Sequence, residues 1–381
     1  MIYWDHNATT PCSPEVVEAM RRYWNEEYGN PSSNHVMGRR AATAVNRSRE
    51  QVSNLINCHP SEIIFTSGAT ESNNLLFMGV LLTSPTERNR IVVSSIEHKS
   101  VLEPARFLTE HGFEIVELSV TRDGVVKLED AEKAITERTL LVSVQAANNE
   151  LGTLQPISEL ADIAHTNGAY FHTDAAQILG KLPFDVQSVN CDFASFSAHK
   201  MYGPKGIGAL FVRGGVRRWP WERPFRGGGQ EMGLRPGTSN VPAIVGFGEA
   251  CRLAINNMSE NVVYLKNLSD EFICALQKSV PDVLLINELQ RSLPGTLSLL
   301  FYGISADVLI ANCNTINISK GSACSSGVIG ASHVINKILE DESLRDSVIR
   351  ISFGIHSSRE DFYRFIDIVC DIRQRSMKNG Q

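Results

Sequence analysis

Residues 195–206 read Ser-Phe-Ser-Ala-His-Lys-Met-Tyr-Gly-Pro-Lys-Gly. The stretch joins the end of an expected strand to a Gly-Pro-Lys-Gly turn, and it places Lys200 directly after an alanine and a histidine. A lysine in this setting is a strong candidate for forming a Schiff base with a carbonyl group. An isolated match to such a pattern is weak, because most lysines are solvated surface charges. Whether Lys200 has this role therefore depends on what the rest of the chain supplies.

Short β-rich segments alternate with helical patterns between residues 62 and 212. The expected strands are Glu62–Thr66, Arg90–Ser95, Glu114–Leu118, Thr139–Gln145, Ala169–Asp174, Asp192–Ser197 and Gly208–Val212. The helical segments between them include Thr70–Leu82, Val101–His111 and Ser158–Thr166. Several of the strands are continuous apolar runs, which is typical of strands covered on both faces. The alternation predicts an α/β fold built on a large, mostly parallel, seven-stranded sheet.

Polar residues stand out at the ends of these strands. In parallel sheets, ligands bind at the carboxyl ends of the strands. The residues in question are Thr66–Thr70, Glu97–His98, Asn148–Asn149, Asp174–Gln177 and Ser197–Lys200. Because these ends meet at one edge of a sheet, we expect the side chains to form one site.

The pattern changes after the last strand of the series. A stretch rich in Gly, Pro and Arg runs from 213 to 237. Such a stretch could form a surface for a partner, but it is more often an ordered connection between elements. A helix is expected over 241–257, followed by mixed helices and short strands. We expect a large domain of residues 13–250 and a smaller α+β domain formed by residues 1–12 and 251–381.

The composition excludes several classes of protein. The 381 residues are 43% hydrophobic and 20% charged, as in a globular protein with a large core, and the net charge of −6 does not favour direct binding of nucleic acid. The densest apolar stretch, Leu75–Leu82, is too short to span a bilayer, and the first residues do not resemble a secretory signal. The eight cysteines form no C-x-x-C motif. We expect a cytoplasmic protein with reduced thiols, no metal site and no membrane partner.

Three features suit a cofactor that has a phosphate and a pyridine ring. The segment Thr66-Ser-Gly-Ala-Thr-Glu-Ser-Asn-Asn74 opens a helix and can bind an anion through backbone N–H groups, although an ordinary helix cap has the same composition. His98 could stack on the ring and Asp174 could keep its nitrogen protonated, which would make the ring an electron sink. Gln177 could bond a ring hydroxyl. The alternatives are an unremarkable loop histidine and an aspartate that caps a helix.

Other residues suggest the substrate. Arg350, in Val-Ile-Arg-Ile-Ser-Phe-Gly, could bind a carboxylate with two hydrogen bonds or could pair with a buried acid. Asn149 could contact cofactor or substrate, or could be a turn asparagine. Cys324 lies in Gly-Ser-Ala-Cys-Ser-Ser-Gly, a setting that favours an accessible, reactive thiol over a structural one.

With these residues assembled, the chain resembles the cysteine desulfurases of the bacterial housekeeping and nitrogen-fixation type. They are class V aminotransferases, a branch of the fold-type I pyridoxal-phosphate enzymes. The resemblance extends from Asp5-His-Asn-Ala-Thr-Thr to Arg350-Ile-Ser-Phe-Gly. Its motifs follow the family's order: Tyr28-Gly-Asn-Pro-Ser-Ser, Thr66-Ser-Gly-Ala-Thr-Glu-Ser-Asn-Asn, Glu97-His-Lys, Asn148-Asn-Glu-Leu-Gly, His172-Thr-Asp-Ala-Ala-Gln, Ser197-Ala-His-Lys, Arg235-Pro-Gly-Thr and Gly321-Ser-Ala-Cys.

The resemblance implies a role for each matching position. Lys200 would form the Schiff base with pyridoxal 5′-phosphate, Asp174 would pair with the ring nitrogen, Gln177 with the ring oxygen, and His98 would stack on the ring and act in catalysis. The residues implied to hold the phosphate are Ala69, Thr70, Ser197 and His199, with Thr238 reaching from a neighbouring subunit of a homodimer. The residues implied to bind substrate are Asn30, Asn149 and Arg350.

The same resemblance implies the reaction. L-cysteine would become L-alanine, and Cys324 would take the sulfur as a persulfide and pass it to an acceptor protein. Iron–sulfur cluster assembly, tRNA thiolation and DNA phosphorothioation are the uses of sulfur that remain open. The family pattern has Ser at Pro236 and Gly at Ala198, and its scaffold-docking tail is not apparent after Met377. The 25 residues between Cys324 and Arg350 resemble the long-loop branch.

Rival interpretations use the same residues differently. An aminotransferase would employ Lys200 and Asp174 but would leave Cys324 without a task. A selenocysteine lyase would use the whole set on another substrate. A non-catalytic sulfur carrier or assembly subunit would keep the fold without the reaction, and the intact Lys200, Asp174 and His98 argue against it. A nicotinamide enzyme fits poorly, because Gly203-Pro-Lys-Gly-Ile-Gly has the wrong glycine spacing and precedes a strand.

Overall fold

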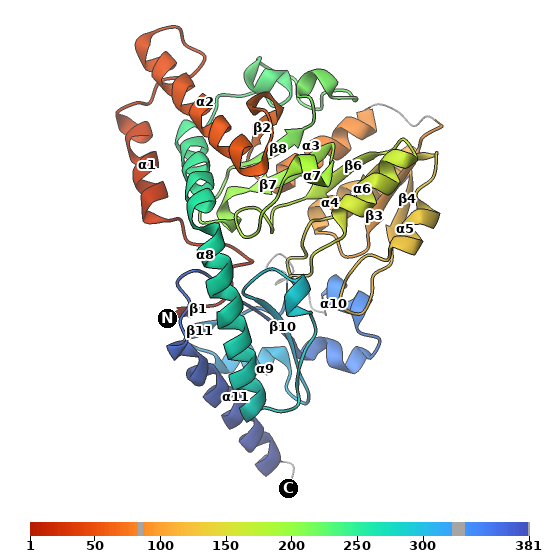
Figure 1. The fold of residues 1–381 in the computed structure, drawn as a ribbon, viewed down its shortest axis with the longest axis vertical. Coiled ribbons are helices and arrows are strands. Elements are labelled where there is room, and N and C mark those ends of the chain that lie inside the picture. The colour runs from red at the N-terminus through yellow and green to blue at the C-terminus, as the bar shows by residue number, and fades with distance from the viewer. Residues whose placement is uncertain (83–86, 322–331, 380–381) are drawn as a thin grey trace.

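The computed structural model describes residues 1–82, 87–321 and 332–379, and it has the expected α/β architecture. Its main sheet has seven strands in the order β2-β8-β7-β6-β5-β3-β4 (Figure 1). The bounds are β2 (Ile63–Thr66), β3 (Arg90–Ser94), β4 (Glu114–Leu118), β5 (Thr139–Ser143), β6 (Tyr170–Asp174), β7 (Phe193–Ser197) and β8 (Gly208–Val212). Strand β8 runs antiparallel to both of its neighbours, and the other pairings are parallel. The prediction of a mostly parallel, seven-stranded sheet is therefore confirmed.

Helices cover both faces of this sheet because its strands alternate their side chains between two cores. On β3, Ile91 and Val93 face a cluster that includes α3 and α4, whereas Val92 faces the cluster that includes α2, α6 and α8. The helices are α1 (Pro14–Asn25), α2 (Val36–Ile56), α3 (Ala69–Leu82), α4 (Lys99–Phe107), α5 (Leu128–Ala134), α6 (Ile157–Thr166), α7 (Val186–Val189), α8 (Val241–Ser279), α9 (Ala306–Asn312), α10 (His333–Ile338) and α11 (Glu360–Asn379). Apolar burial on both faces explains the continuous hydrophobic runs in the sequence.

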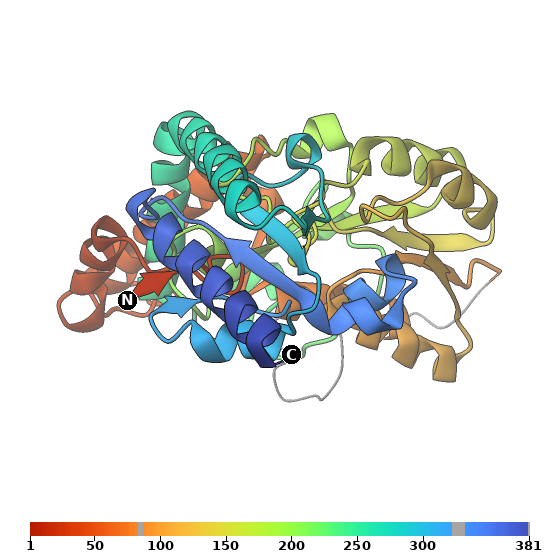
Figure 2. The ribbon, with the colours of Figure 1, turned by 90° about the horizontal axis from the view of Figure 1, so that it is seen from below.

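A second, smaller core forms around a three-stranded antiparallel sheet. Its strands lie in the order β12 (Val348–Ser352), β10 (Thr296–Phe301) and β9 (Val283–Leu285). The N-terminal strand β1 (Ile2–Tyr3) pairs with β11 (Ile316–Asn317) in the same region. Figure 2 shows α8 and α11 beside these strands, and the ring of Phe272 on α8 lies 5.9 Å from that of Phe365 on α11.

The prediction for α8 is wrong in length. We expected this helix to end near Asn257, but it continues to Ser279. Its second half buries Leu265, Leu268, Phe272 and Leu276 at the spacing of one helix face, so the second core extends the helix. In Figure 1, α8 runs from the main sheet down to the smaller one.

The domain division stays a proposal: residues 13–250 form the large domain, and residues 1–12 with 251–381 form the small one. The separate second core, with Trp4 fully buried in it, supports the assignment of the N-terminus to the small domain. Helix α8 crosses residue 250 without a break and links the two.

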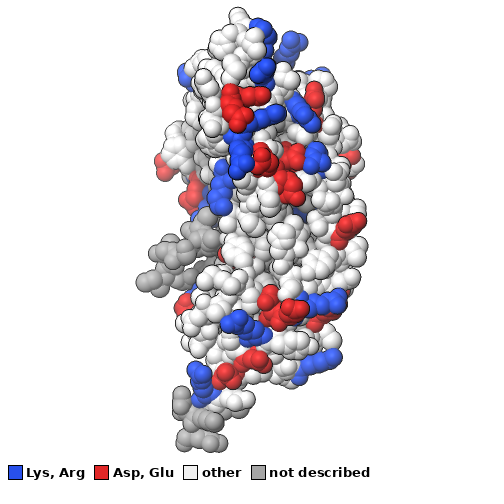
Figure 3. Space-filling model, turned by 90° about the vertical axis from the view of Figure 1, so that its left-hand side faces the viewer, with Lys and Arg blue, Asp and Glu red and all other residues white. Residues whose placement is uncertain are grey.

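Charged side chains lie over much of the face drawn in Figure 3, where basic and acidic groups are interspersed. Within the described residues, every helix is too short or too polar to cross a bilayer.

The small core gives a direct test of packing. Phe365 on α11 is fully buried against Trp4, whereas Tyr363 on the same helix is 68% exposed. Phe365→Ala should lower the free energy of unfolding by about 3–5 kcal/mol, because it leaves a cavity among aromatic rings. Urea denaturation measures this change, and Tyr363→Ala should stay within about 0.5 kcal/mol of the wild type. Equal losses in the two variants would contradict the placement of α11.

Candidate active site

A cavity of about 180 Å³ lies at the carboxyl ends of the central strands. It is lined by Asp174 at the end of β6, by Ser197 at the end of β7 and by residues from the loops that follow β3 and β5. The predicted site residues that line it are Ala69, Thr70, His98, Asn149, Asp174, Gln177, Ser197, His199, Lys200 and Arg350. The structure thus brings ten of the predicted residues together at one edge of the sheet.

Lys200 ends a short 3₁₀ turn, Ala198–Lys200, that follows β7 directly. Its Nζ donates hydrogen bonds to the carbonyl oxygens of Asn7, at 2.6 Å, and Ala8, at 2.8 Å. The turn fixes the backbone of the lysine at the edge of the cavity, and the N-terminal segment fixes its amine. Both of these bonds go to backbone carbonyl oxygens, and an amine can exchange such hydrogen bonds for a bond to a carbonyl-bearing ligand.

Asp174 is buried and belongs to a chain of hydrogen bonds. Its Oδ1 accepts from the backbone N–H of Ala176, at 3.0 Å, and its Oδ2 accepts from Nδ2 of Asn73, at 2.8 Å. The same Asn73 amide donates to Oγ of Ser100, at 2.9 Å, and that hydroxyl lies 2.8 Å from Nδ1 of His98. Asp174 thus presents a buried carboxylate at the cavity, and its Oδ1 accepts from the backbone in the local pattern of an Asx turn.

His98 is the N-cap of α4, since its Nδ1 accepts the backbone N–H of Ser100 at 3.1 Å. An Nδ1 that accepts from a backbone donor carries no proton, so Nε2 holds the hydrogen of the neutral ring. Burial lowers the pKa of His98, Asp174 opposes this shift, and the positive charge of Lys200 adds to it. The ring is therefore neutral at neutral pH, and the same residue caps α4 and lines the cavity. Its role toward a cofactor stays a prediction.

The beginning of α3 fits an anion. The N–H of Ala69, the first residue of α3, donates to Oγ of Ser197 at 2.8 Å, which places that hydroxyl on the helix N-terminus. Gly68, with φ of +152°, precedes it, and a Cβ there would come within 3.3 Å of the same hydroxyl oxygen. The helix dipole and the small residues suit a phosphate at this point. Together with the carboxylate of Asp174 and the amine of Lys200, this cradle fits pyridoxal phosphate.

Arg350 on β12 reaches the cavity from the small sheet. It is only 2% exposed, and its guanidinium donates to Oδ1 of Asp5, at 2.6 Å, and to the backbone oxygen of Asn149, at 3.0 Å. Its Nε has no hydrogen-bond partner in the described part of the chain. Of the two alternatives raised by the sequence, the structure shows the pairing with an acid. The unpartnered Nε–H is a buried donor, and its use by a substrate carboxylate stays a prediction.

Three predicted residues are not in this cavity. Asn30 is exposed, and its Oδ1 accepts from the backbone of Ser32. Thr238 is also exposed on this chain, as a residue that serves a neighbouring subunit would be. Cys324 lies outside the described residues. The roles of all three stay predictions.

Five residues that support the predicted site residues were not themselves predicted from the sequence. They are Asn7, Asn73, Ser100, Gln145 and Lys181; the first four line the cavity or bond to its lining, and Lys181 bonds to Asn7 and Gln177. Asn7 and Asn73 stood in quoted motifs without a role. Lys181 follows Gln177 by four residues, a spacing that places two side chains on one side of a helical turn.

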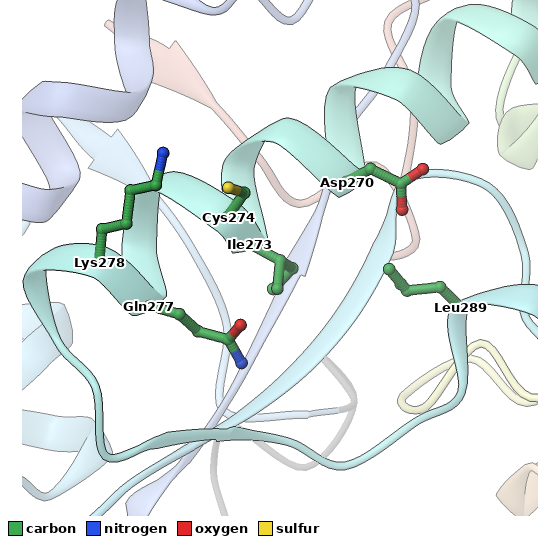
Figure 4. A pocket seen from close by; sticks show the side chains of 6 residues that line it. All are labelled: Asp270, Ile273, Cys274, Gln277, Lys278 and Leu289. Atoms are coloured by element: carbon green, nitrogen blue, oxygen red, sulfur yellow. The ribbon is translucent and has the colours of Figure 1, made fainter.

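A second cavity, of about 430 Å³, lies on α8 and is lined by Asp270, Ile273, Cys274, Gln277, Lys278 and Leu289 (Figure 4). None of the predicted site residues lines it. Cys274 is exposed there, but no carboxylate–lysine–arginine set accompanies it, so the chemistry belongs to the first cavity.

Comparison with known proteins places this geometry in a family. The profile of the aminotransferase class-V family matches residues 2–365. A protein of Dictyoglomus turgidum named cysteine desulfurase IscS is 41% identical over 370 residues, which cover 97% of this chain and 93% of that protein. A solved structure titled NifS-like protein matches with a TM-score of 0.90 and 37% identity, over 98% of this chain and 99% of that one. A structure titled SspA in complex with cysteine matches with a TM-score of 0.80 and 34% identity, over 94% and 100% of the two chains.

The fold and the site thus define a member of the aminotransferase class-V family. Within that class, the extent of the match shows that the chain belongs to the family of cysteine desulfurases.

The Asp5–Arg350 pair generates a stability prediction. Asp5→Asn should lower the free energy of unfolding by about 3 kcal/mol, because it leaves a buried guanidinium without its carboxylate. Glu342→Gln is the matched control, since Glu342 is 84% exposed in its pair with Arg345 and should cost less than about 1 kcal/mol. Denaturant unfolding compares the two, and equal small effects would contradict the buried pair.

Proposed function

We propose that this protein is a cysteine desulfurase that uses pyridoxal phosphate to convert L-cysteine to L-alanine and retains the sulfur as a persulfide on Cys324. The observation that carries the proposal is the convergence of Lys200, Asp174 and Arg350 on one cavity. A primary amine can form a Schiff base, and a buried carboxylate can keep a ring nitrogen protonated. A guanidinium can bind the carboxylate of an amino acid.

The chain's residues would hold the cofactor at three points. Ala69, Thr70, Ser197 and His199 would bind its phosphate at the N-terminus of α3. Asp174, fixed by Asn73, would face the ring nitrogen, and Gln177 would bond the ring oxygen. The neutral ring of His98 would pack against the cofactor ring. When bound, pyridoxal phosphate supplies an electron sink that stabilises negative charge at the substrate Cα.

The substrate would be oriented by Arg350 and handled by Lys200. The carboxylate of L-cysteine would take the buried Nε–H of Arg350, and Lys200 lines the same cavity. Lys200 would remove the Cα proton as a general base. Once the substrate C–S bond has broken, one proton goes to Cβ and one returns to Cα, so that the product is L-alanine. The hydrogen-bonded chain from His98 to Asp174 would keep both groups in place during this transfer.

Cys324 would complete the reaction as a nucleophile. Its thiolate would attack the substrate Sγ, so that the substrate C–S bond breaks and an S–S bond forms. One cysteine and one thiol thus yield one alanine and one persulfide, with no external oxidant. An acceptor protein would then take the sulfur, for iron–sulfur assembly or for another sulfur-transfer pathway, in the cytoplasm.

A test of these roles uses two variants. Lys200→Ala should abolish alanine formation and the visible absorbance of bound cofactor, because it removes the amine that both require. Cys324→Ala should keep the absorbance and lose persulfide, with alanine formation reduced by at least about a hundredfold. Alanine assays and persulfide labelling provide the readout. Undiminished turnover in Cys324→Ala would instead support an aminotransferase or lyase without a cysteine nucleophile.

We further propose that the protein is a homodimer in which Thr238 completes the phosphate site of the neighbouring subunit. The exposure of the large apolar side chains of Trp24, Tyr28 and Val36 supports the proposal, since burying such side chains against a second copy favours association. Sedimentation of the purified protein should give twice the chain mass. A monomer that binds cofactor and forms alanine would contradict the role of Thr238.

A further inference from the structure

A second lysine lies behind the active site, and the proposed reaction gives it no task. Lys181 is half-buried as a residue, but its ammonium group points into the interior, where Nζ donates to Oδ1 of Asn7, at 2.9 Å, and to Oε1 of Gln177, at 3.0 Å. It does not line the cavity itself, whereas both of its partners do. Lys181 therefore acts on the cavity only through the groups it holds.

The bonds of Gln177 are fixed by this contact. Its Oε1 accepts from Lys181, and its Nε2 donates to the backbone oxygen of Asn7 at 3.0 Å. An amide can be turned by half a rotation without steric change, but a turned Gln177 would present its NH₂ group to the ammonium and its oxygen to a carbonyl. The lysine thus admits one orientation, in which Nε2 keeps a second N–H for an oxygen in the cavity.

The neighbours of Lys181 are mainly cationic or neutral. Its positive neighbours from other elements are Lys200, after β7, and Arg350, on β12. The charge of Lys181 also acts on two further titratable groups, His6 and His199. The neighbouring Arg350 is paired with Asp5. Burial, reinforced by the charges of Lys200 and Arg350, lowers the pKa of Lys181 to about 7. The ammonium is charged below that pH and loses its charge as the pH rises through it.

We propose that Lys181 is a positioning residue of this active site, which orients the amide of Gln177 toward the cofactor's ring oxygen and opposes protonation at the neighbouring Lys200. The inference rests on the proposed function, because it assigns the orienting bond to the cofactor that Lys200 would carry. Like charges disfavour one another's protonated forms, so a charged Lys181 favours the unprotonated nitrogen on Lys200. A neutral nitrogen is the form that exchanges with an incoming amine.

The test uses Lys181→Met, which removes charge and hydrogen bond, and Lys181→Gln, which keeps a donor but no charge. Lys278→Met, on the exposed surface of α8, is the matched control. The purified holoenzymes are titrated from about pH 6 to about pH 9, and the midpoint of the change in visible cofactor absorbance is read. Loss of the charge should raise that midpoint in both Lys181 variants by at least about half a pH unit.

The dissociation constant of pyridoxal phosphate separates the two effects. It should rise by about tenfold in Lys181→Met, because the orienting bond is lost, and by less than about threefold in Lys181→Gln. Wild-type values of both midpoint and affinity in the two variants would overturn the inference. If Lys181→Met does not fold, the midpoint in Lys181→Gln decides. A wild-type protein that binds pyridoxal phosphate but makes no alanine would overturn the proposed reaction. The absorbance midpoints and the dissociation constants would still test the role of Lys181.

Discussion

The active site depends on a short N-terminal segment, Asp5–Ala8, that is hydrogen-bonded to both sheets. On one side, the backbone N–H groups of His6 and Asn7 donate to the carbonyl and hydroxyl oxygens of Ser352 on β12. On the other side, the carbonyls of Asn7 and Ala8 accept from Lys200 after β7. Because the same few residues bond to β12 and to Lys200, they hold the two parts of the site next to each other.

That constraint explains why the polar side chains of the site have few other orientations in which their hydrogen bonds are satisfied. Asn7 alone bonds to Lys181, Gln177, Lys200 and, through its amide, to the backbone of Asn149. Each buried donor or acceptor in such a network is costly to leave unpaired, so the members fix one another's orientation. A site preorganised in this way needs little rearrangement to receive a cofactor with one carbonyl, one ring nitrogen and one phosphate.

Much of this arrangement could be predicted from the sequence, and the limits have physical reasons. The strands of the main sheet are predictable because several are apolar runs that alternate with helical patterns, and the site is predictable because polar residues follow strands whose carboxyl ends meet at one edge. The end of α8 is not predicted because its second half is buried by residues distant in the sequence, among them Trp4, Phe353 and Phe365. The bonds of Lys200 and Lys181 to Asn7 join residues 193 and 174 positions apart, and no local pattern announces contacts at that separation. The role of Cys324 rests on its sequence setting alone.

The most direct test of the account is to incubate the purified holoenzyme with L-cysteine and to measure alanine together with the persulfide on each cysteine by peptide mapping. The account predicts equal amounts of alanine and persulfide in the first turnover, with the sulfur on Cys324. Alanine with the sulfur on another residue, or with no protein-bound sulfur, would contradict the assigned nucleophile. A cofactor-loaded protein that forms no alanine would contradict the assignment of the reaction itself.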